Sequence, residues 1–197
     1  MVRKLIVKFA LFATLLSAWG CALPQEGLLP KVELPAVPHA AELKSTVSFK
    51  ISFLPPPNTE VEQKLAEEFI QEFERANLFR TVYPAPIAAE VHMTVVLTQA
   101  VAVTPKHFAL YLATGGLSPI RVPSIYELHA EIRGCLGKDV KYDIKDEASK
   151  IVWSPGWPPG VDWHIDPTSS SVRRNLYRTL IMRMHGDGLL HRCAEIN

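Results

Sequence analysis

The sequence is poor in the features that mark enzymes and nucleic-acid-binding proteins. Its 197 residues include three cysteines and seven histidines, without an HExxH spacing, a G-x-S-x-G turn or a phosphate-binding loop. The formal net charge is +1, and three of the cations, Arg3, Lys4 and Lys8, lie in the first twenty residues, so the remaining chain is slightly acidic. These absences argue against an enzyme, against a metal or cofactor, and against nucleic acid as a partner.

The sequence also lacks an apolar run long enough to cross a bilayer as a helix, which takes about 20 residues. Its N-terminus instead has positive residues up to Lys8, an apolar stretch from Phe9 to Leu16, and small residues just before Cys21. This order is typical of a signal peptide. We therefore expect residues 1–20 to be a targeting leader.

The end of this leader, Ser17-Ala18-Trp19-Gly20-Cys21, resembles the lipobox of bacterial lipoprotein precursors. The resemblance implies cleavage after Gly20 and attachment of a diacylglyceryl group, with fatty acids such as palmitate, to the Cys21 thiol. Two or more acyl chains hold a protein stably on a membrane. Because Ala22 rather than aspartate follows, the resemblance implies a lipid anchor in the outer membrane, on its periplasmic face. An ordinary secretory signal is the alternative.

Residues 21–44 contain four prolines, Pro24, Pro30, Pro35 and Pro38, and no sustained apolar period. This composition predicts an extended tether rather than folded structure, with a reach of up to about 70 Å. We expect one folded domain over residues 45–197.

Apolar residues alternate with polar ones over residues 47–53 and again over 91–98, which predicts two half-buried strands. Between them, Thr59-x-x-Glu62 forms a capping box for a helix that is expected to end near Asn77. A hairpin is predicted over residues 123–145.

The last predicted element is a helix that begins between Asp166 and Ser171, where Pro167 suits a first turn, and ends at Gly186. The order of elements predicts an α+β fold, a two-layer sandwich in which a mainly antiparallel sheet of four to five strands carries two helices on one face.

This layout, together with Leu112–Pro119 and Asn175–Arg178, resembles small envelope lipoproteins of Gram-negative bacteria, among them the Pel export and curli secretion lipoproteins. The resemblance implies a non-catalytic accessory or scaffold component of an export or envelope-assembly machine. Its expected partners are the membrane, other envelope proteins, or further copies of the same chain in a homo-oligomeric ring.

Cys135 and Cys193 remain once Cys21 carries a lipid, an even pair in an oxidising compartment. A disulfide between them would stabilise the domain by about 2 to 4 kcal/mol. The alternative is two thiols that lie too far apart to meet.

Trp153, Trp157 and Trp163 lie in one segment interrupted by Pro-Gly pairs, which predicts a loop. Exposed tryptophans suit a protein interface, or a platform for a ligand or glycan in an alternative function as a periplasmic binding module. The rings could equally fold back and cover the core.

Arg173, Arg174 and Arg178 in the last helix oppose the acidic first helix in sign. We interpret them as a candidate interface for carboxylates, phosphates or acidic glycans, or for the acidic helix of a neighbouring copy. A solvated helix face is the simpler alternative.

The apolar segment Phe108–Ala113 allows a strand, a short helix or an element that enters a membrane in an oligomer. An element of the hydrophobic core is the favoured prediction.

Overall fold

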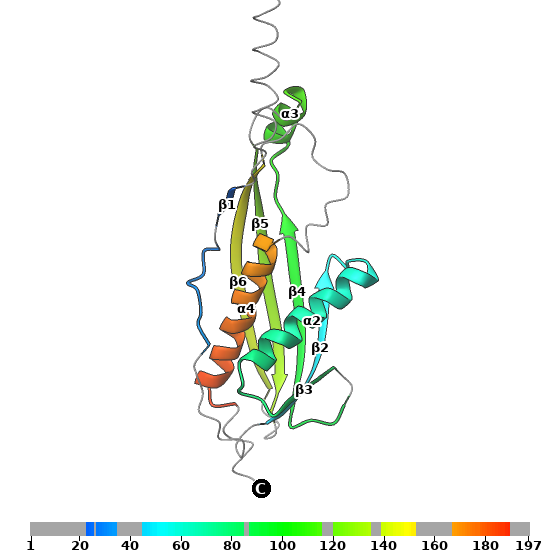
Figure 1. Cartoon of the computed structure of the whole chain (residues 1–197), viewed down its shortest axis with the longest axis vertical. Helices are drawn as coiled ribbons and strands as arrows, with labels where there is room; N and C mark the ends of the chain where they lie inside the picture. Colours follow the sequence, from blue (N-terminus) through cyan, green and yellow to red (C-terminus); the bar gives the residue numbers. More distant parts are fainter. Residues whose placement is uncertain are drawn as a thin grey trace, which may run out of the picture.

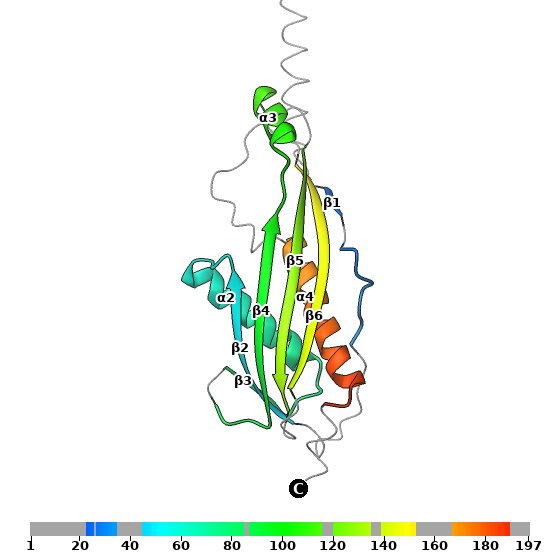
Figure 2. The ribbon, with the colours of Figure 1, turned by 180° about the vertical axis from the view of Figure 1, so that it is seen from behind.

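The computed structural model describes residues 23–25, 27–34, 45–84, 87–115, 120–134, 139–152 and 167–189. The elements in chain order are β1 (Leu23–Gln25), β2 (Thr46–Leu54), α2 (Thr59–Arg75), β3 (Thr81–Pro84), β4 (Val91–Val101), α3 (Pro105–Ala113), β5 (Ile120–Arg133), β6 (Asp139–Val152) and α4 (Pro167–Gly186). Figures 1 and 2 show α2 and α4 on the same face of one sheet. The predicted α+β, two-layer architecture is confirmed. Among the described helices, none has the length and apolar character needed to cross a membrane.

The sheet has six strands in the order β1-β6-β5-β4-β2-β3, rather than the four to five predicted. β2 pairs with β3 and β4 in parallel, whereas the β4–β5, β5–β6 and β1–β6 pairs are antiparallel. The predicted hairpin is the β5–β6 pair, in which Arg133 lies opposite Asp139. The sequence pattern missed β1 and β3 because strands of three and four residues are too short to show an alternation.

The core lies between the sheet and the two helices. The inward positions of β4 and the apolar stripes of α2 and α4 are buried as the periodicity predicts. Phe69 of α2 is central, with its ring centroid 5.1 Å from that of Phe49 on β2 and 5.0 Å from that of Tyr177 on α4. Edge-to-face packing of the Phe69 and Tyr177 rings, at 84°, joins the two helices above the sheet.

The ends of α2 are determined by asparagines. The N-cap is Asn58, whose Oδ1 accepts a hydrogen bond from the Val61 amide at 2.9 Å, so the capping box predicted at Thr59 is wrong by one residue. Beyond the other end, Asn77 adopts a left-handed conformation with φ of 53°, which stops the helix as predicted.

Residues 27–34, called the strap below, pack along the domain and do not form the free tether predicted for residues 21–44. The Leu28 and Leu29 amides both donate to Oδ1 of the buried Asp146 on β6, at 2.7 and 3.0 Å. The prediction failed because the strap is held by hydrogen bonds from its backbone amides, and the hydropathy of the side chains does not reveal such bonds.

Asn175 of α4 holds the strap farther along. Its Oδ1 accepts from the Val32 amide at 2.9 Å, and its Nδ2 donates to the Pro30 carbonyl at 3.2 Å. A side-chain amide offers both a donor and an acceptor, so it can hold an extended backbone much as a neighbouring strand would. The strap therefore joins β6 and α4 at the edge of the sandwich.

Helix α3 lies beyond the end of the sheet, away from α2 and α4 (Figure 1). Of its nine residues only Tyr111 is buried, in a small cluster with Ile120 and Val122 of β5. The prediction that Phe108–Ala113 belongs to the main core is therefore wrong. The apolar residues around Tyr111 face outward, because the sandwich core ends before this helix begins.

The contact between the strap and Asp146 can be tested at Gly27. A Cβ at this position would overlap with the Asp146 carboxylate, which is held in place by the two strap amides. We expect Gly27→Ala to lower the free energy of unfolding by about 1 to 3 kcal/mol, as overpacking does. Denaturant unfolding followed by circular dichroism measures it.

The matched control is Gly186→Ala, because a Cβ there meets nothing within 4 Å. This variant should be as stable as the parent or slightly more so. Equal stability of both variants would show that the strap is not seated on Asp146.

Candidate functional site

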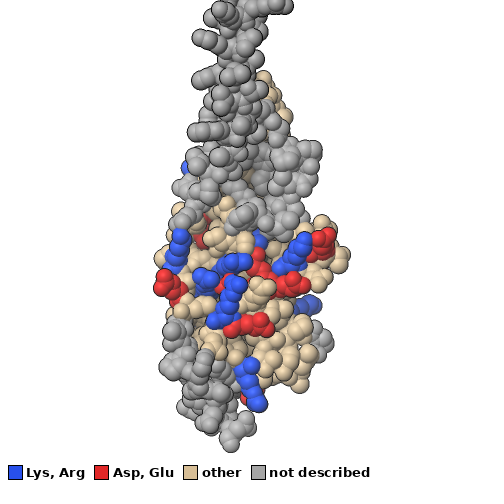
Figure 3. Space-filling view, viewed as in Figure 1, with Lys and Arg blue, Asp and Glu red and all other residues tan. Residues whose placement is uncertain are grey.

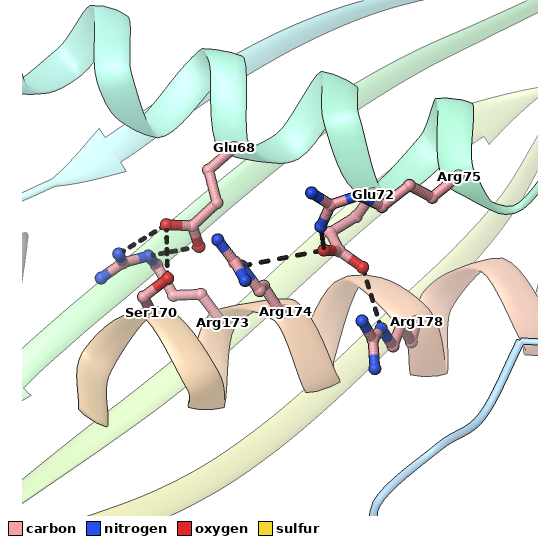
Figure 4. A network of polar contacts seen from close by, with 7 residues as sticks. All are labelled: Glu68, Glu72, Arg75, Ser170, Arg173, Arg174 and Arg178. Atoms are coloured by element: carbon pink, nitrogen blue, oxygen red, sulfur yellow. Dashed lines mark hydrogen bonds and ion pairs between the residues drawn. The ribbon is translucent and has the colours of Figure 1, made fainter. Parts of the chain in front are cut away.

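A cluster of charged side chains joins α2 to α4 on the helix-bearing face of the sheet (Figure 4). Glu68 and Glu72 come from α2, where a spacing of four residues places them on one side of the helix. The arginines come from successive turns of α4, and Ser170 and Arg75 complete the cluster.

The Glu68–Arg173 pair is buried and has the geometry of a fork. Arg173 donates through Nε to Glu68 Oε1 at 3.2 Å and through Nη2 to Oε2 at 2.9 Å, while Ser170 donates to the same Oε2 at 3.0 Å. The Arg173 side chain is 1% exposed. A buried guanidinium that lost this carboxylate would be an uncompensated charge, so the pair constrains how the two helices meet.

Glu72 is fully buried and is shared by three arginines. Arg75 and Arg178 donate to its two oxygens at 2.7 and 2.8 Å, and Arg174 lies 3.7 Å away. One carboxylate therefore faces three guanidinium groups, whose side chains are 34% to 52% exposed. The cluster has an excess of positive charge, and this excess is carried by its solvent-facing members.

This arrangement changes the interpretation of the arginine-bearing helix. Arg173 is inside the molecule and is paired, so it is not part of an open interface. Arg174 and Arg178 remain partly exposed and stay candidates for contact. The acidic partner that the sequence suggested on a neighbouring copy is α2 of the same chain, because the fold places both helices side by side on one face.

A groove of about 640 Å³ runs beside the cluster, between the strap and α4. Its lining is polar and mainly basic: Lys31, Val32 and Glu33 from the strap, and Ser170, Ser171, Arg174, Asn175 and Arg178 from α4. Figure 3 shows the blue cations gathered over the middle of this helix-bearing face, with acidic groups between them. Three of the four charged residues in this lining, Lys31, Arg174 and Arg178, are cations of the kind that pair with carboxylate or phosphate groups.

The sequence interpretation missed Glu72 and Asp146, although a signal for both was present. Glu72 lies three residues after Phe69 and seven after Leu65, on the buried side of α2. Asp146 continues the inward series Tyr142 and Ile144 on β6 and is 2% exposed. A carboxylate at a core position of an amphipathic pattern indicates a buried partner.

The opposite face of the sheet carries a ladder of charge pairs between β5 and β6. Glu127 lies directly opposite Lys145, Glu131 opposite Lys141, His129 opposite Asp143, and Arg133 opposite Asp139, and each pair is in contact. The Lys141 ammonium holds the pKa of Glu131 below its usual value, and Arg133 does the same for Asp139. Opposite charges across strands favour the register of the hairpin.

Two histidines of the described chain make polar contacts on the sheet. His92 contacts Ser48, whereas His129, four residues away in strand register, contacts Asp143 and lies 3.7 Å from Glu131. Burial raises the pKa of the Tyr177 hydroxyl and of Tyr142, which also donates to Asp187. Within the described ranges, no group of three His, Cys, Asp or Glu side chains is arranged to hold a metal ion.

Several predicted site residues lie outside the described residues: the lipidation and cleavage pair Cys21 and Gly20, the cysteines Cys135 and Cys193, and the tryptophans Trp153, Trp157 and Trp163. Their assignments remain predictions.

No protein-family model and no curated protein matches this chain. Among solved structures it is similar to the PelC dodecamer from Paraburkholderia phytofirmans, with 17% identity and a TM-score of 0.32 over 82% of this chain and 94% of that one. It is also similar to a minor lipoprotein from Acinetobacter baumannii, with 10% identity and a TM-score of 0.36 over 74% and 94%. A third similar structure is the rare lipoprotein B from Shewanella oneidensis, with 11% identity and a TM-score of 0.31 over 75% of this chain and 94% of that one. At these scores the similarity carries no argument about assembly or activity.

The shared carboxylate predicts a large effect of Glu72→Gln. The substitution leaves three guanidinium groups without their counter-charge, and we expect the free energy of unfolding to fall by about 2 to 3 kcal/mol, discounted for the partial exposure of the arginines. Urea unfolding at neutral pH measures it.

Glu60→Gln is the control, because Glu60 lies on the same helix and pairs with Lys64 in solvent. Its midpoint should stay close to that of the parent. Similar losses in both variants would contradict the special role of the buried carboxylate.

Proposed function

We propose that this chain is a lipid-anchored, non-catalytic lipoprotein of the bacterial envelope, placed on the periplasmic face of the outer membrane. In this role it serves as an accessory or scaffold component of an export or envelope-assembly machine. The observation that carries the proposal is the cysteine at position 21, which directly follows a leader that resembles those of lipoprotein precursors. The acyl chains attached there would hold the mature domain on a membrane.

The anchor and the domain are closer than a free tether would allow. Leu23–Gln25 forms the edge strand β1 on β6, and the strap continues along α4. A lipid at residue 21 is therefore two residues from the sheet, a span of at most about 7 Å. The domain would be held against its membrane, with one end facing the lipid.

The groove beside the strap is the surface proposed for contact with an envelope partner. Arg174, Arg178 and Lys31 line it, and the first two share a single carboxylate. The excess positive charge suits an acidic segment of a partner protein, because arginine pairs with carboxylates through two parallel hydrogen bonds.

The anchor is tested by metabolic labelling with radioactive palmitate in a Gram-negative host. The full chain should incorporate label, and Cys21→Ser should lose it entirely. Cys193→Ser should keep it, which controls for acylation of another thiol. Label that persists in Cys21→Ser, or an intact mass without acyl groups, would contradict the proposal.

The groove is tested by a photo-crosslinking residue at Ser171, which lines it. Irradiation of intact cells should join this position to an envelope protein. The yield should fall in Lys31→Gln/Arg174→Gln and stay unchanged in Lys50→Gln, which removes a lysine from β2 and leaves the groove intact. Equal crosslinking yields in Lys31→Gln/Arg174→Gln and Lys50→Gln would exclude the groove as a docking surface. So would the absence of any protein joined to position 171.

A further inference from the structure

Helix α3 presents most of its apolar side chains to solvent in the part of the chain that the structure describes. Phe108, Leu110 and Leu112 are 45%, 53% and 61% exposed, although leucine and phenylalanine are among the residues most often buried. Tyr111 is the buried residue of the helix and packs with Ile120 and Val122 of β5, with Val103 against the same cluster. Phe108 and Leu112 are four residues apart and therefore share one side of the helix. Exposed apolar side chains that lie together in this way mark a surface that contacts a partner or a membrane.

The scarcity of charged residues around α3 indicates which kind of surface covers this helix. Residues 100–115 contain no aspartate or glutamate, and Lys106 is their only Lys or Arg. The charge pairs that keep the outer face of the β5–β6 hairpin polar begin farther along the sheet, at Glu127 and Lys145. An apolar helix without acidic groups fits the boundary between lipid headgroups and acyl chains, where anionic lipids repel carboxylates.

The position of α3 relative to the start of the described chain identifies the covering surface. Leu23 of β1 pairs with Ile151, and Ile151 pairs with Arg121 of β5. Arg121 lies between Ile120 and Val122, the two residues of β5 on which Tyr111 of α3 packs. Leu23 is two strand spacings from Arg121, a distance of about 10 Å. Figures 1 and 2 show β1 and α3 toward the same end of the molecule.

We propose that α3 is a membrane-contacting helix, which inserts Phe108 and Leu112 into the surface of the bilayer that holds the Cys21 lipid. The inference rests on the proposed function, because the lipid at residue 21, two residues before β1, brings this end of the domain to the membrane. The helix is too short to cross the bilayer. It acts as a second, weak contact that orients the sheet relative to the membrane plane and leaves the strap groove facing the periplasm.

The test places the photo-crosslinking residue p-benzoylphenylalanine at Phe108 in the full chain, expressed in a Gram-negative host, with a second variant at Leu112. The control position is Ile87, which has the same exposed fraction, 45%, and precedes the start of β4 at the opposite end of that strand. After irradiation of isolated membranes, mass spectrometry identifies what is attached.

The proposal is supported if phospholipid is attached at positions 108 and 112 and is absent from position 87. A second copy of the chain or another protein attached at 108 and 112, or equal amounts of phospholipid at 108 and 87, overturns it. The same spectra report the acyl mass on Cys21. Acylated protein without phospholipid at α3 refutes this inference alone, whereas absence of the acyl mass refutes the proposed function.

Discussion

The buried carboxylates of α2 are the constraint on which the arrangement of the molecule depends. Both helices lie on one face of the sheet, and between them Glu68 and Glu72 meet arginines of α4 where solvent is largely excluded. Apolar packing through Phe69 and Tyr177 would allow the helices to slide, since hydrophobic contact is not directional. A fork-shaped pair has one favourable geometry, so it fixes the position of α4 relative to α2.

The position of α4 in turn determines where the N-terminal segment lies. Asn175 projects from α4 toward the strap, and Asp146 of β6 holds the strap at the preceding residues. The same helix thus carries the buried Arg173, the amide that holds the strap, and one wall of the groove. A disturbance of the charge cluster is expected to reach the groove, because Arg174 and Arg178 belong to both.

The two faces of the domain and the end that carries α3 differ in chemistry. The helix-bearing face has the basic groove, the outer sheet face has paired charges that cancel along the β5–β6 hairpin, and α3 at one end is apolar. Such a distribution suits a protein held in one orientation, with its apolar end on lipid and its basic groove toward a partner.

Regular patterns in the sequence determined the main elements. The alternation in β4, the stripe of α2 from Val61 to Phe73 and the limits of α4 could all be predicted, because each depends on neighbours within a few residues. The predicted leader and the lipidation predicted at Cys21 rest on local signals of the same kind. Tertiary structure alone decided the pairing of Glu72 with Arg174 and Arg178, the seating of the strap on Asp146 and the outward position of α3. These depend on contacts between residues more than a hundred positions apart, or on where the core ends, and no local period encodes either.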